Sequence, residues 1–144
     1  GISPSNAKQL EQAGIKWIEV AGRGGTNWAS IEYARNPSDF EQQVAAPFVN
    51  WGMDTPKLLS AIATNCPSLN LIGSGGVRDG LDIARCLRLG ASISALAQPF
   101  LAPALDSAEA VIDKIAILKE QLSWAMFLTG SKDLEALKRA KLEE

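Results

Sequence analysis

Short apolar segments alternate with longer amphipathic segments along this chain. Residues 15–21, 69–72 and 91–96 are rich in Ile, Val, Leu and Ala, which predicts three strands. Residues 36–54 follow no clear period, so we expect an irregular connection there. Elsewhere apolar residues recur every three or four positions, which predicts helices at 4–13, 27–35, 55–65, 79–89, 107–128 and 132–142.

Proline and glycine set the expected boundaries of these elements. Ser3-Pro4 and Thr55-Pro56 have the pattern of helix starts, in which a hydroxyl residue precedes proline. Gly14 and Gly90 follow the last apolar position of a helix, where glycine readily adopts the left-handed conformation. Gln98-Pro99 is expected to end the third strand, because proline cannot donate to a sheet.

Strands that alternate with helices indicate an α/β fold with parallel pairing and right-handed crossovers. Three parallel strands alone would leave two open edges, whereas eight strands that close into a barrel leave none. The chain also begins at Gly1 rather than at a methionine. We therefore expect these residues to be part of a longer, barrel-forming chain.

Composition narrows the function classes. The chain has 144 residues, of which 47 % are apolar and 21 % charged, with a net charge of −2. The apolar and charged fractions are typical of a folded protein, and the slightly negative net charge argues against a nucleic-acid partner. No apolar run is long enough to span a membrane. Histidine is absent, so these residues hold no Ser-His-Asp or Cys-His centre. Cys66 and Cys86 lack metal-ligand spacing and are expected to be buried, reduced thiols of a cytoplasmic protein.

The most informative motif is GSGGVRDG at residues 73–80, between a predicted strand and a predicted helix. Glycines let the backbone approach a ligand, and the first turn of a helix directs free amides and a positive dipole at it. Arg78 could add a charged hydrogen bond. The spacing matches neither the dinucleotide-binding nor the P-loop pattern. It predicts a phosphate site; the alternative is a tight turn that needs glycine only for its conformation.

Two further turns follow predicted strands. Ala97-Gln98 ends the third strand, and in barrels a phosphate commonly lies between the loops after two successive strands; alternatively, Pro99 merely ends the strand. Residues 22–26 (GRGGT) follow the first strand. Thr26 is expected either to contact the ligand or to cap the next helix, and Trp28 either to flank a flat ligand or to join the core.

Three such turns at one edge of a sheet predict a large ligand that carries phosphate, such as a flavin or a nucleotide. No acid and base are paired at this edge, because Glu19 lies within a strand and Asp79 within a helix cap. Glu32 and Arg35 are expected to form a surface ion pair. We therefore expect a cofactor-binding segment that carries no catalytic residue and no metal ligand of its own.

Several motifs, in order along nearly the whole chain, resemble the type 2 isopentenyl-diphosphate isomerases. They are GGTNWxxIE from Gly24, WGxxT from Trp51, GSGGVRxGLD from Gly73 and MFLTG from Met126. The GSGGVR turn recurs in many barrels that bind FMN or phosphate. The GGTNW block together with MFLTG is much more specific.

The resemblance implies an FMN-dependent (β/α)8 TIM barrel that interconverts isopentenyl and dimethylallyl diphosphate in isoprenoid biosynthesis. The double bond moves by addition and removal of a proton, and reduced FMN takes part directly. The resemblance also implies Mg²⁺ on the diphosphate and NADPH as the reductant of the flavin. We further expect a homo-oligomer with no nucleic-acid or membrane partner.

On the motifs that match, Thr26 would contact FMN after the sixth strand of the barrel. Gly76, Val77 and Arg78 would hold the FMN phosphate after the seventh strand, largely through backbone amides. Ala21 stands where some relatives have a serine near the flavin, so the resemblance assigns it no role.

Ala97 and Gln98 would complete the phosphate site after the eighth strand. Residues 1–144 would then be the C-terminal portion of a single FMN-binding barrel domain, about strands six to eight with their helices. The flavin-contacting lysine and the magnesium-binding glutamate of the family would lie in the N-terminal half. We therefore expect residues 1–144 to be inactive by themselves.

Two alternatives stay open. Another FMN or phosphate-binding barrel, such as a 2-hydroxy-acid oxidase or a nucleotide dehydrogenase, would share the glycine turn, although an oxidase of that kind would need a histidine base. The other alternative is an inactive fragment that only binds phosphate.

Overall fold

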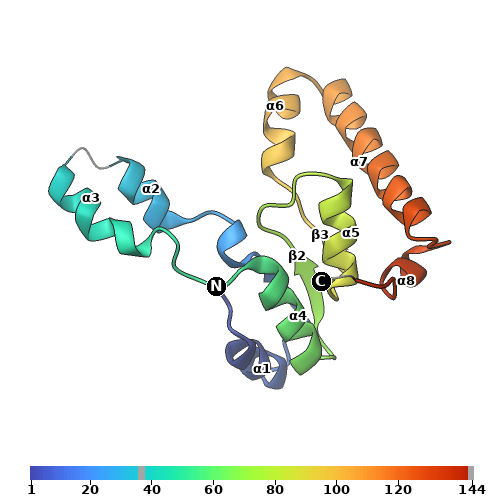
Figure 1. Ribbon diagram of the computed structural model, residues 1–144, viewed down its shortest axis with the longest axis horizontal. Helices are drawn as coiled ribbons and strands as arrows, with labels where there is room; N and C mark the ends of the chain where they lie inside the picture. The colour runs from blue at the N-terminus through green and yellow to red at the C-terminus, as the bar shows by residue number, and fades with distance from the viewer. Residues whose placement is uncertain (36–37, 143–144) are drawn as a thin grey trace.

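The computed structural model describes residues 1–35 and 38–142. Its centre is a parallel sheet of β1 (Trp17–Val20), β2 (Asn70–Gly73) and β3 (Ile93–Ser94), in that spatial order. Strands β2 and β3 are labelled in Figure 1. Helix α1 (Pro4–Gln12) precedes the sheet, α4 (Thr55–Asn65) leads into β2, and α5 (Gly80–Arg88) connects β2 to β3. The remaining elements are η1 (Gly22–Gly24), α2 (Trp28–Arg35), α3 (Asp39–Ala45), η2 (Ala46–Phe48), α6 (Gln98–Asp106), α7 (Ala108–Leu128) and α8 (Leu134–Leu137).

Side-chain caps stabilise the first turns of α5 and α7. The Asp79 carboxylate accepts a hydrogen bond from the Asp82 amide at 2.8 Å where α5 begins. The Ser107 hydroxyl accepts one from the Ala110 amide at 3.0 Å where α7 begins. Each cap satisfies an amide that has no partner inside its helix, which fixes where the helix starts.

Helices cover one face of the sheet. Ile18 and Val20 of β1 and Leu71 of β2 are buried in one core cluster with side chains of α1 and α4. On the other face, Trp17 is 50 % exposed and Ile93 is 49 % exposed. Consecutive parallel strands with all crossover helices on one face form an arc of a barrel, whereas a doubly wound sheet reverses its strand order and covers both faces.

A second cluster joins α5 to the C-terminal helices. Ala84 and Leu87 of α5 pack with Ala125 of α7 and Leu137 of α8. Gly80, at the start of α5, lies so close to α7 that a Cβ there would be 2.5 Å from the Leu122 nitrogen. Glycine at this position therefore lets α7 pack directly against α5.

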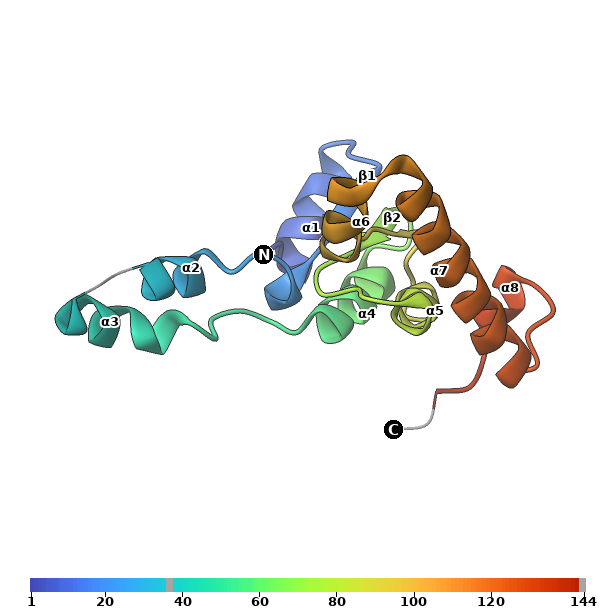
Figure 2. The same cartoon turned by 90° about the horizontal axis from the view of Figure 1, so that it is seen from above.

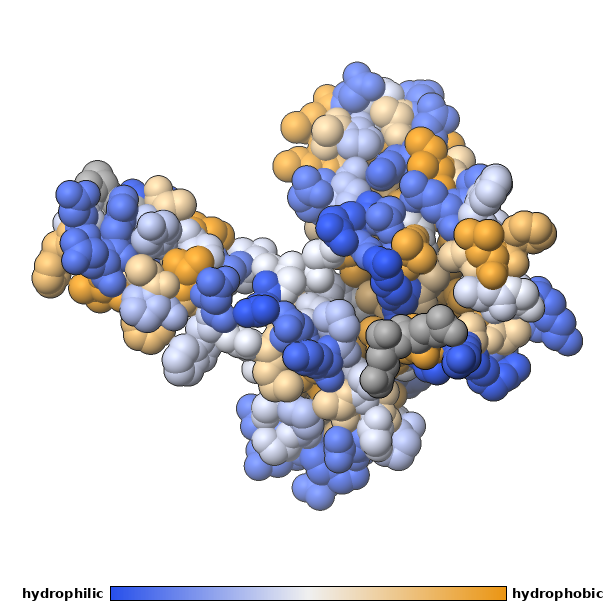
Figure 3. Space-filling view, in the orientation of Figure 1, coloured by the Kyte–Doolittle hydropathy of each residue, from blue (hydrophilic) through white to orange (hydrophobic). Residues whose placement is uncertain are grey.

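Residues 28–35 and 38–53, called the arm below, project away from the sheet (Figures 1 and 2). Helices α2 and α3 and the turn η2 contact one another, and none of them contains a buried residue. Apolar side chains lie on the surface of the arm (Figure 3). The large exposed ones are Trp28, Tyr33, Phe40, Val44, Phe48, Trp51 and Met53.

The predicted strands and most predicted helices are confirmed, each within a few residues. The irregular connection expected at 36–54 is wrong for residues 39–48, which form α3 and η2, whereas residues 49–54 contain no helix or strand; residues 36–37 lie outside the described residues. Ser38 starts α3 by accepting a hydrogen bond from the Glu41 amide at 3.5 Å. The last helix, expected at 132–142, is only the single turn α8.

Within the described ranges, no helix is both long and apolar enough to cross a lipid bilayer.

Candidate functional site

The loops that follow the three strands meet around one cavity of about 670 Å³, called the strand-end cavity below. Parallel strands place their carboxyl ends at the same edge of a sheet, so loops far apart in sequence become neighbours there. All the residues proposed from the sequence to bind the cofactor line this cavity. They are Thr26 after β1, Gly76, Val77 and Arg78 after β2, and Ala97 and Gln98 after β3.

The first two loops touch through glycines. A Cβ at Gly76 would lie 3.1 Å from the Gly24 carbonyl oxygen, and one at Gly75 would meet the backbone of Ala21 and Gly25. Gly75 and Gly76 also have φ angles of +76° and +78°, a conformation that favours glycine. The loop after β2 therefore needs glycine both for its conformation and for its close approach to the loop after β1.

Backbone amides are the main donors available at the cavity. Within residues 1–35 and 38–142, the amides of Gly76 and Val77 have no hydrogen-bond acceptor. Two loop amides on consecutive residues, next to left-handed glycines, form a small concave site that suits an anion. These two amides are thus free for the backbone role proposed from the sequence. The Arg78 amide, which was assigned the same role, instead donates to Oδ2 of Asp82 at 3.3 Å.

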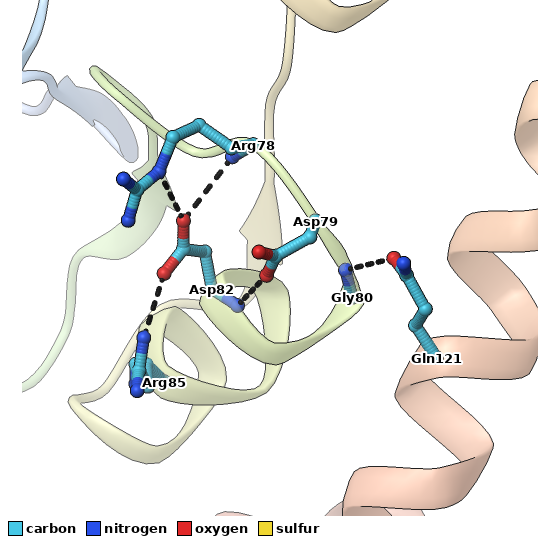
Figure 4. A network of polar contacts seen from close by, with 6 residues as sticks. All are labelled: Arg78, Asp79, Gly80, Asp82, Arg85 and Gln121. Carbon is cyan, nitrogen blue, oxygen red and sulfur yellow. Dashed lines mark hydrogen bonds and ion pairs between the residues drawn. The ribbon is translucent and has the colours of Figure 1, made fainter.

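The first turn of α5 does not open on the cavity, contrary to the sequence-based expectation, because neither Gly80 nor Leu81 lines it. The Gly80 amide donates to Oε1 of Gln121 at 2.9 Å, and the Asp82 amide donates to its cap, Asp79 (Figure 4). The sequence pattern could not reveal the Gln121 contact, because it comes from α7, 41 residues further along the chain.

Helix α6, rather than α5, directs its first turn at the cavity. It begins at Gln98, has no side-chain cap, and opens on the cavity with Ala97 and Gln98. The amides of Ala97 and Gln98 have no acceptor among the described residues, so the positive end of the α6 dipole lies at the cavity. Helix α6 was not expected from the sequence, because Gln98-Pro99 was interpreted only as the end of a strand. Proline in the first helical turn was the available signal.

Arg78 is engaged with Asp82 rather than directed freely at a ligand. Its Nε donates to Oδ2 of Asp82 at 2.9 Å, and Arg85 donates to Oδ1 of the same carboxylate at 2.9 Å (Figure 4). Partial burial raises the pKa of Asp82, but the hydrogen bonds from the two arginines outweigh it, so the pKa lies below its ordinary value. The hydrogen bond to Asp82 also raises the pKa of Arg78. The Arg78 side chain remains 71 % exposed beside the cavity.

Thr26 lies at the cavity and does not cap α2. Asn27 has that role, since its Oδ1 accepts a hydrogen bond from the Ser30 amide at 3.1 Å. Thr26 makes no hydrogen bond within residues 1–35 and 38–142, which leaves its hydroxyl available to a ligand. Trp28 is 71 % exposed and lies outside the strand-end cavity, so it is not a core aromatic.

Ser74 also lines the cavity, and the sequence analysis assigned it no role. It is 5 % exposed, and its Oγ has no hydrogen-bond partner among the described residues. A buried hydroxyl without a partner is uncommon in folded proteins and indicates a missing partner. No sequence pattern distinguishes such a serine from one that serves only as a small residue in a turn.

The site suits the binding of an anionic group more than proton transfer. Glu19 of β1 and Arg78 of the loop after β2 are the charged residues that line the cavity. In the described part of the chain, no three His, Cys, Asp or Glu side chains come close enough to hold a metal ion. Cys66 and Cys86 are free and buried, as predicted, and burial raises the pKa of the Cys86 thiol.

The comparison with protein families agrees with these observations. A family described as FMN-dependent dehydrogenase matches residues 2–144. The isopentenyl-diphosphate delta-isomerase of Stutzerimonas stutzeri (strain A1501) is 44 % identical over 142 residues, which cover 99 % of this chain and 41 % of that protein. The isomerase of the same name from Cronobacter sakazakii (strain ATCC BAA-894) is 45 % identical over 142 residues, with the same coverage. The chain thus spans about two fifths of the length of the curated relatives it matches.

Solved structures show the fold. A putative lactate oxidase of Pediococcus acidilactici superposes with a TM-score of 0.73 and 24 % identity, over 100 % of this chain and 36 % of that one. A mandelate oxidase variant with benzoyl-formic acid gives a TM-score of 0.75 and 19 % identity, over 99 % of this chain and 37 % of that one. The three parallel strands and their helices therefore match part of an FMN-dependent barrel enzyme, as the strand order indicates.

Proposed function

The chain belongs to the FMN-dependent dehydrogenase family, and from that membership we propose that it is the FMN-phosphate-binding portion of a type 2 isopentenyl-diphosphate isomerase. The full-length enzyme would interconvert isopentenyl and dimethylallyl diphosphate. In its barrel, β1, β2 and β3 would be strands six, seven and eight. One observation carries the proposal: three loops converge on the strand-end cavity, and those after β2 and β3 carry unpaired backbone amides.

Each of the proposed residues has a distinct role toward the phosphate of FMN. The amides of Gly76 and Val77 would donate to it from one side, and the amides of Ala97 and Gln98, with the α6 dipole, from the other. Arg78 would add positive charge from the rim while Asp82 holds its side chain in place. The Thr26 hydroxyl would donate a hydrogen bond to the flavin.

FMN, when bound, supplies the group that exchanges a proton with the substrate in this family. The residues of this chain orient it and hold its phosphate. Mg²⁺ on the substrate diphosphate and NADPH as the flavin reductant complete the proposal, as the family resemblance implies. We assign their binding to parts of the full-length enzyme other than residues 1–144. Because both cysteines are free, we also propose a cytoplasmic location.

The test uses the full-length protein that carries these residues. We expect it to purify with one flavin per chain and, once reduced by NADPH, to isomerise isopentenyl diphosphate in a reaction that EDTA abolishes. Lactate and glycolate serve as the contrasting substrates. Oxidation of either one, without isomerisation, would indicate a 2-hydroxy-acid oxidase, whereas absence of bound flavin would refute the proposed site.

We further propose that the enzyme is a homo-oligomer in which a second copy covers the arm. The supporting observation is the set of exposed aromatic side chains on the arm, whose two short helices pack on each other and on η2 without a buried residue. Helices of 8 and 7 residues are marginal in isolation. Clustered apolar surface of this kind typically marks a protein interface.

A further inference from the structure

Ser74 is the first residue after β2, and its backbone is held firmly. Its amide donates to the Val20 carbonyl at 3.1 Å, which extends the pairing between β1 and β2 by one residue. The side chain is therefore fixed at the base of the loop that carries Gly75 and Gly76. Its Oγ is buried and has no partner within residues 1–35 and 38–142.

Other hydroxyls near the sheet are satisfied. The Ser94 hydroxyl donates to the Gly73 carbonyl at 3.0 Å, and the Thr55 hydroxyl donates to the Ala21 carbonyl. The fold thus provides backbone acceptors for hydroxyls next to the loops after β1 and β2. The Ser74 hydroxyl lies at the start of the loop after β2 and uses none of these acceptors, so packing alone does not account for a polar side chain there.

The cavity that Ser74 lines is rich in donors and poor in negative charge. The unpaired amides of Gly76, Val77, Ala97 and Gln98 all lie at this cavity, as does the start of α6. A group that accepts hydrogen bonds from several directions at once, such as a phosphate, would satisfy them together. A hydroxyl at the base of the same loop can donate to the same group.

We propose that Ser74 is a further ligand-binding residue, whose Oγ turns about the Cα–Cβ bond into the strand-end cavity and donates a hydrogen bond to the phosphate of bound FMN. This inference rests on the proposed function, since it takes FMN as the ligand. It adds a side-chain donor to a site otherwise built from backbone amides. The structural sign of this role is that Oγ is buried and has no partner among the described residues.

The test replaces Ser74 in the full-length protein and compares FMN with riboflavin, which lacks the phosphate. Flavin is removed from each protein and the affinity is measured by titration of flavin fluorescence. Ser74→Ala is expected to weaken FMN binding by about 10- to 100-fold, the effect of losing one hydrogen bond to a charged acceptor. Its riboflavin affinity is expected to stay within about twofold of the wild type, because riboflavin has no group for this bond.

A second signature separates binding from folding. Removing an unpaired buried hydroxyl relieves its desolvation, so flavin-free Ser74→Ala is expected to melt at the same temperature as the wild type or higher. Ser131→Ala is the matched control: Ser131 is also buried, but its hydroxyl pairs with that of Thr129 at 2.9 Å and does not line the cavity. This control is expected to melt lower and to bind FMN normally.

Ser74→Cys, with a weaker donor of similar size, should bind FMN with intermediate affinity. Unchanged FMN affinity in Ser74→Ala would overturn the inference while leaving the proposed function intact. Equal losses of FMN and riboflavin would overturn the assignment to the phosphate. A wild-type protein that binds neither flavin would overturn the proposed function and this inference together.

Discussion

The strand-end cavity and the arm are built in opposite ways, although the chain passes directly from one to the other at Thr26 and Asn27. Around the cavity, backbone meets backbone, and the loops carrying Gly24 and Gly75 leave no room for a side chain. In the arm, no residue of α2 or α3 is buried, and Phe40 is 75 % exposed. The cavity is thus shaped by backbone contacts within this chain, whereas the arm leaves its large apolar side chains exposed.

The largest expected effect tests how tightly the cavity is built. Gly75→Ala would force a Cβ against the backbone of Ala21 and Gly25, at a φ of +76°. Overpacking and conformational strain together should lower the free energy of unfolding by about 3–5 kcal/mol and abolish flavin retention. Urea denaturation and the flavin content of the purified protein measure the two effects.

Gly14→Ala is the matched control for Gly75→Ala. Gly14 has a φ of +90°, but a Cβ there would meet no atom within 4 Å. Only the strain of the left-handed conformation should remain, about 1–2 kcal/mol, with normal flavin content. Similar losses in the two variants would mean that contact between the loops does not determine the cavity.

The same contrast explains what the sequence could predict. Strand positions, helix caps and glycine turns depend on local pattern, and these predictions were confirmed for β1, β2, α5 and α7. The convergence of Thr26, Val77 and Gln98 on one cavity also followed, because parallel strands place their loops at one edge. Their binding of FMN stays a prediction.

Features that depend on distant partners could not be predicted. Gln121 of α7 accepts a hydrogen bond from the Gly80 amide, and Asp82 accepts one from the Arg78 guanidinium. The sequence led us to expect that both donors would be free, and neither is. Ser74 stands out only once its surroundings are known. The arm was missed for a different reason: short helices without a buried face have weak apolar periodicity.

A smaller effect separates the core behind the cavity from the arm. Leu59 of α4 is fully buried, so Leu59→Ala should cost about 2–5 kcal/mol of unfolding free energy at any protein concentration. Phe40→Ser should instead act through assembly, lowering the native mass measured by light scattering, with a stability loss that depends on protein concentration. A native mass unchanged by Phe40→Ser would contradict coverage of the arm by a second copy, at least through this residue.

The smallest effect concerns the ion pairs of Asp82 at the rim of the cavity and of Glu32 in the arm, and how each contribution to stability depends on pH. The pKa of Asp82 is lowered in the folded state, so its ionised form stabilises the fold at neutral pH and this stabilisation is lost as pH falls through the folded pKa. Asp82→Asn should therefore lower the free energy of unfolding by about 1 kcal/mol at pH 7, and this difference from the wild type should shrink below about pH 4.

In the arm, Glu32 and Arg35 are 3.9 Å apart and both exposed, so Glu32→Gln should change the free energy of unfolding by less than about 0.5 kcal/mol. Urea denaturation of both variants between pH 3 and pH 7, a range chosen around the reference carboxyl pKa of about 4, measures the contrast. A cost of Asp82→Asn that stays constant across this range would mean that the two arginines do not hold the carboxylate that orders the rim of the cavity.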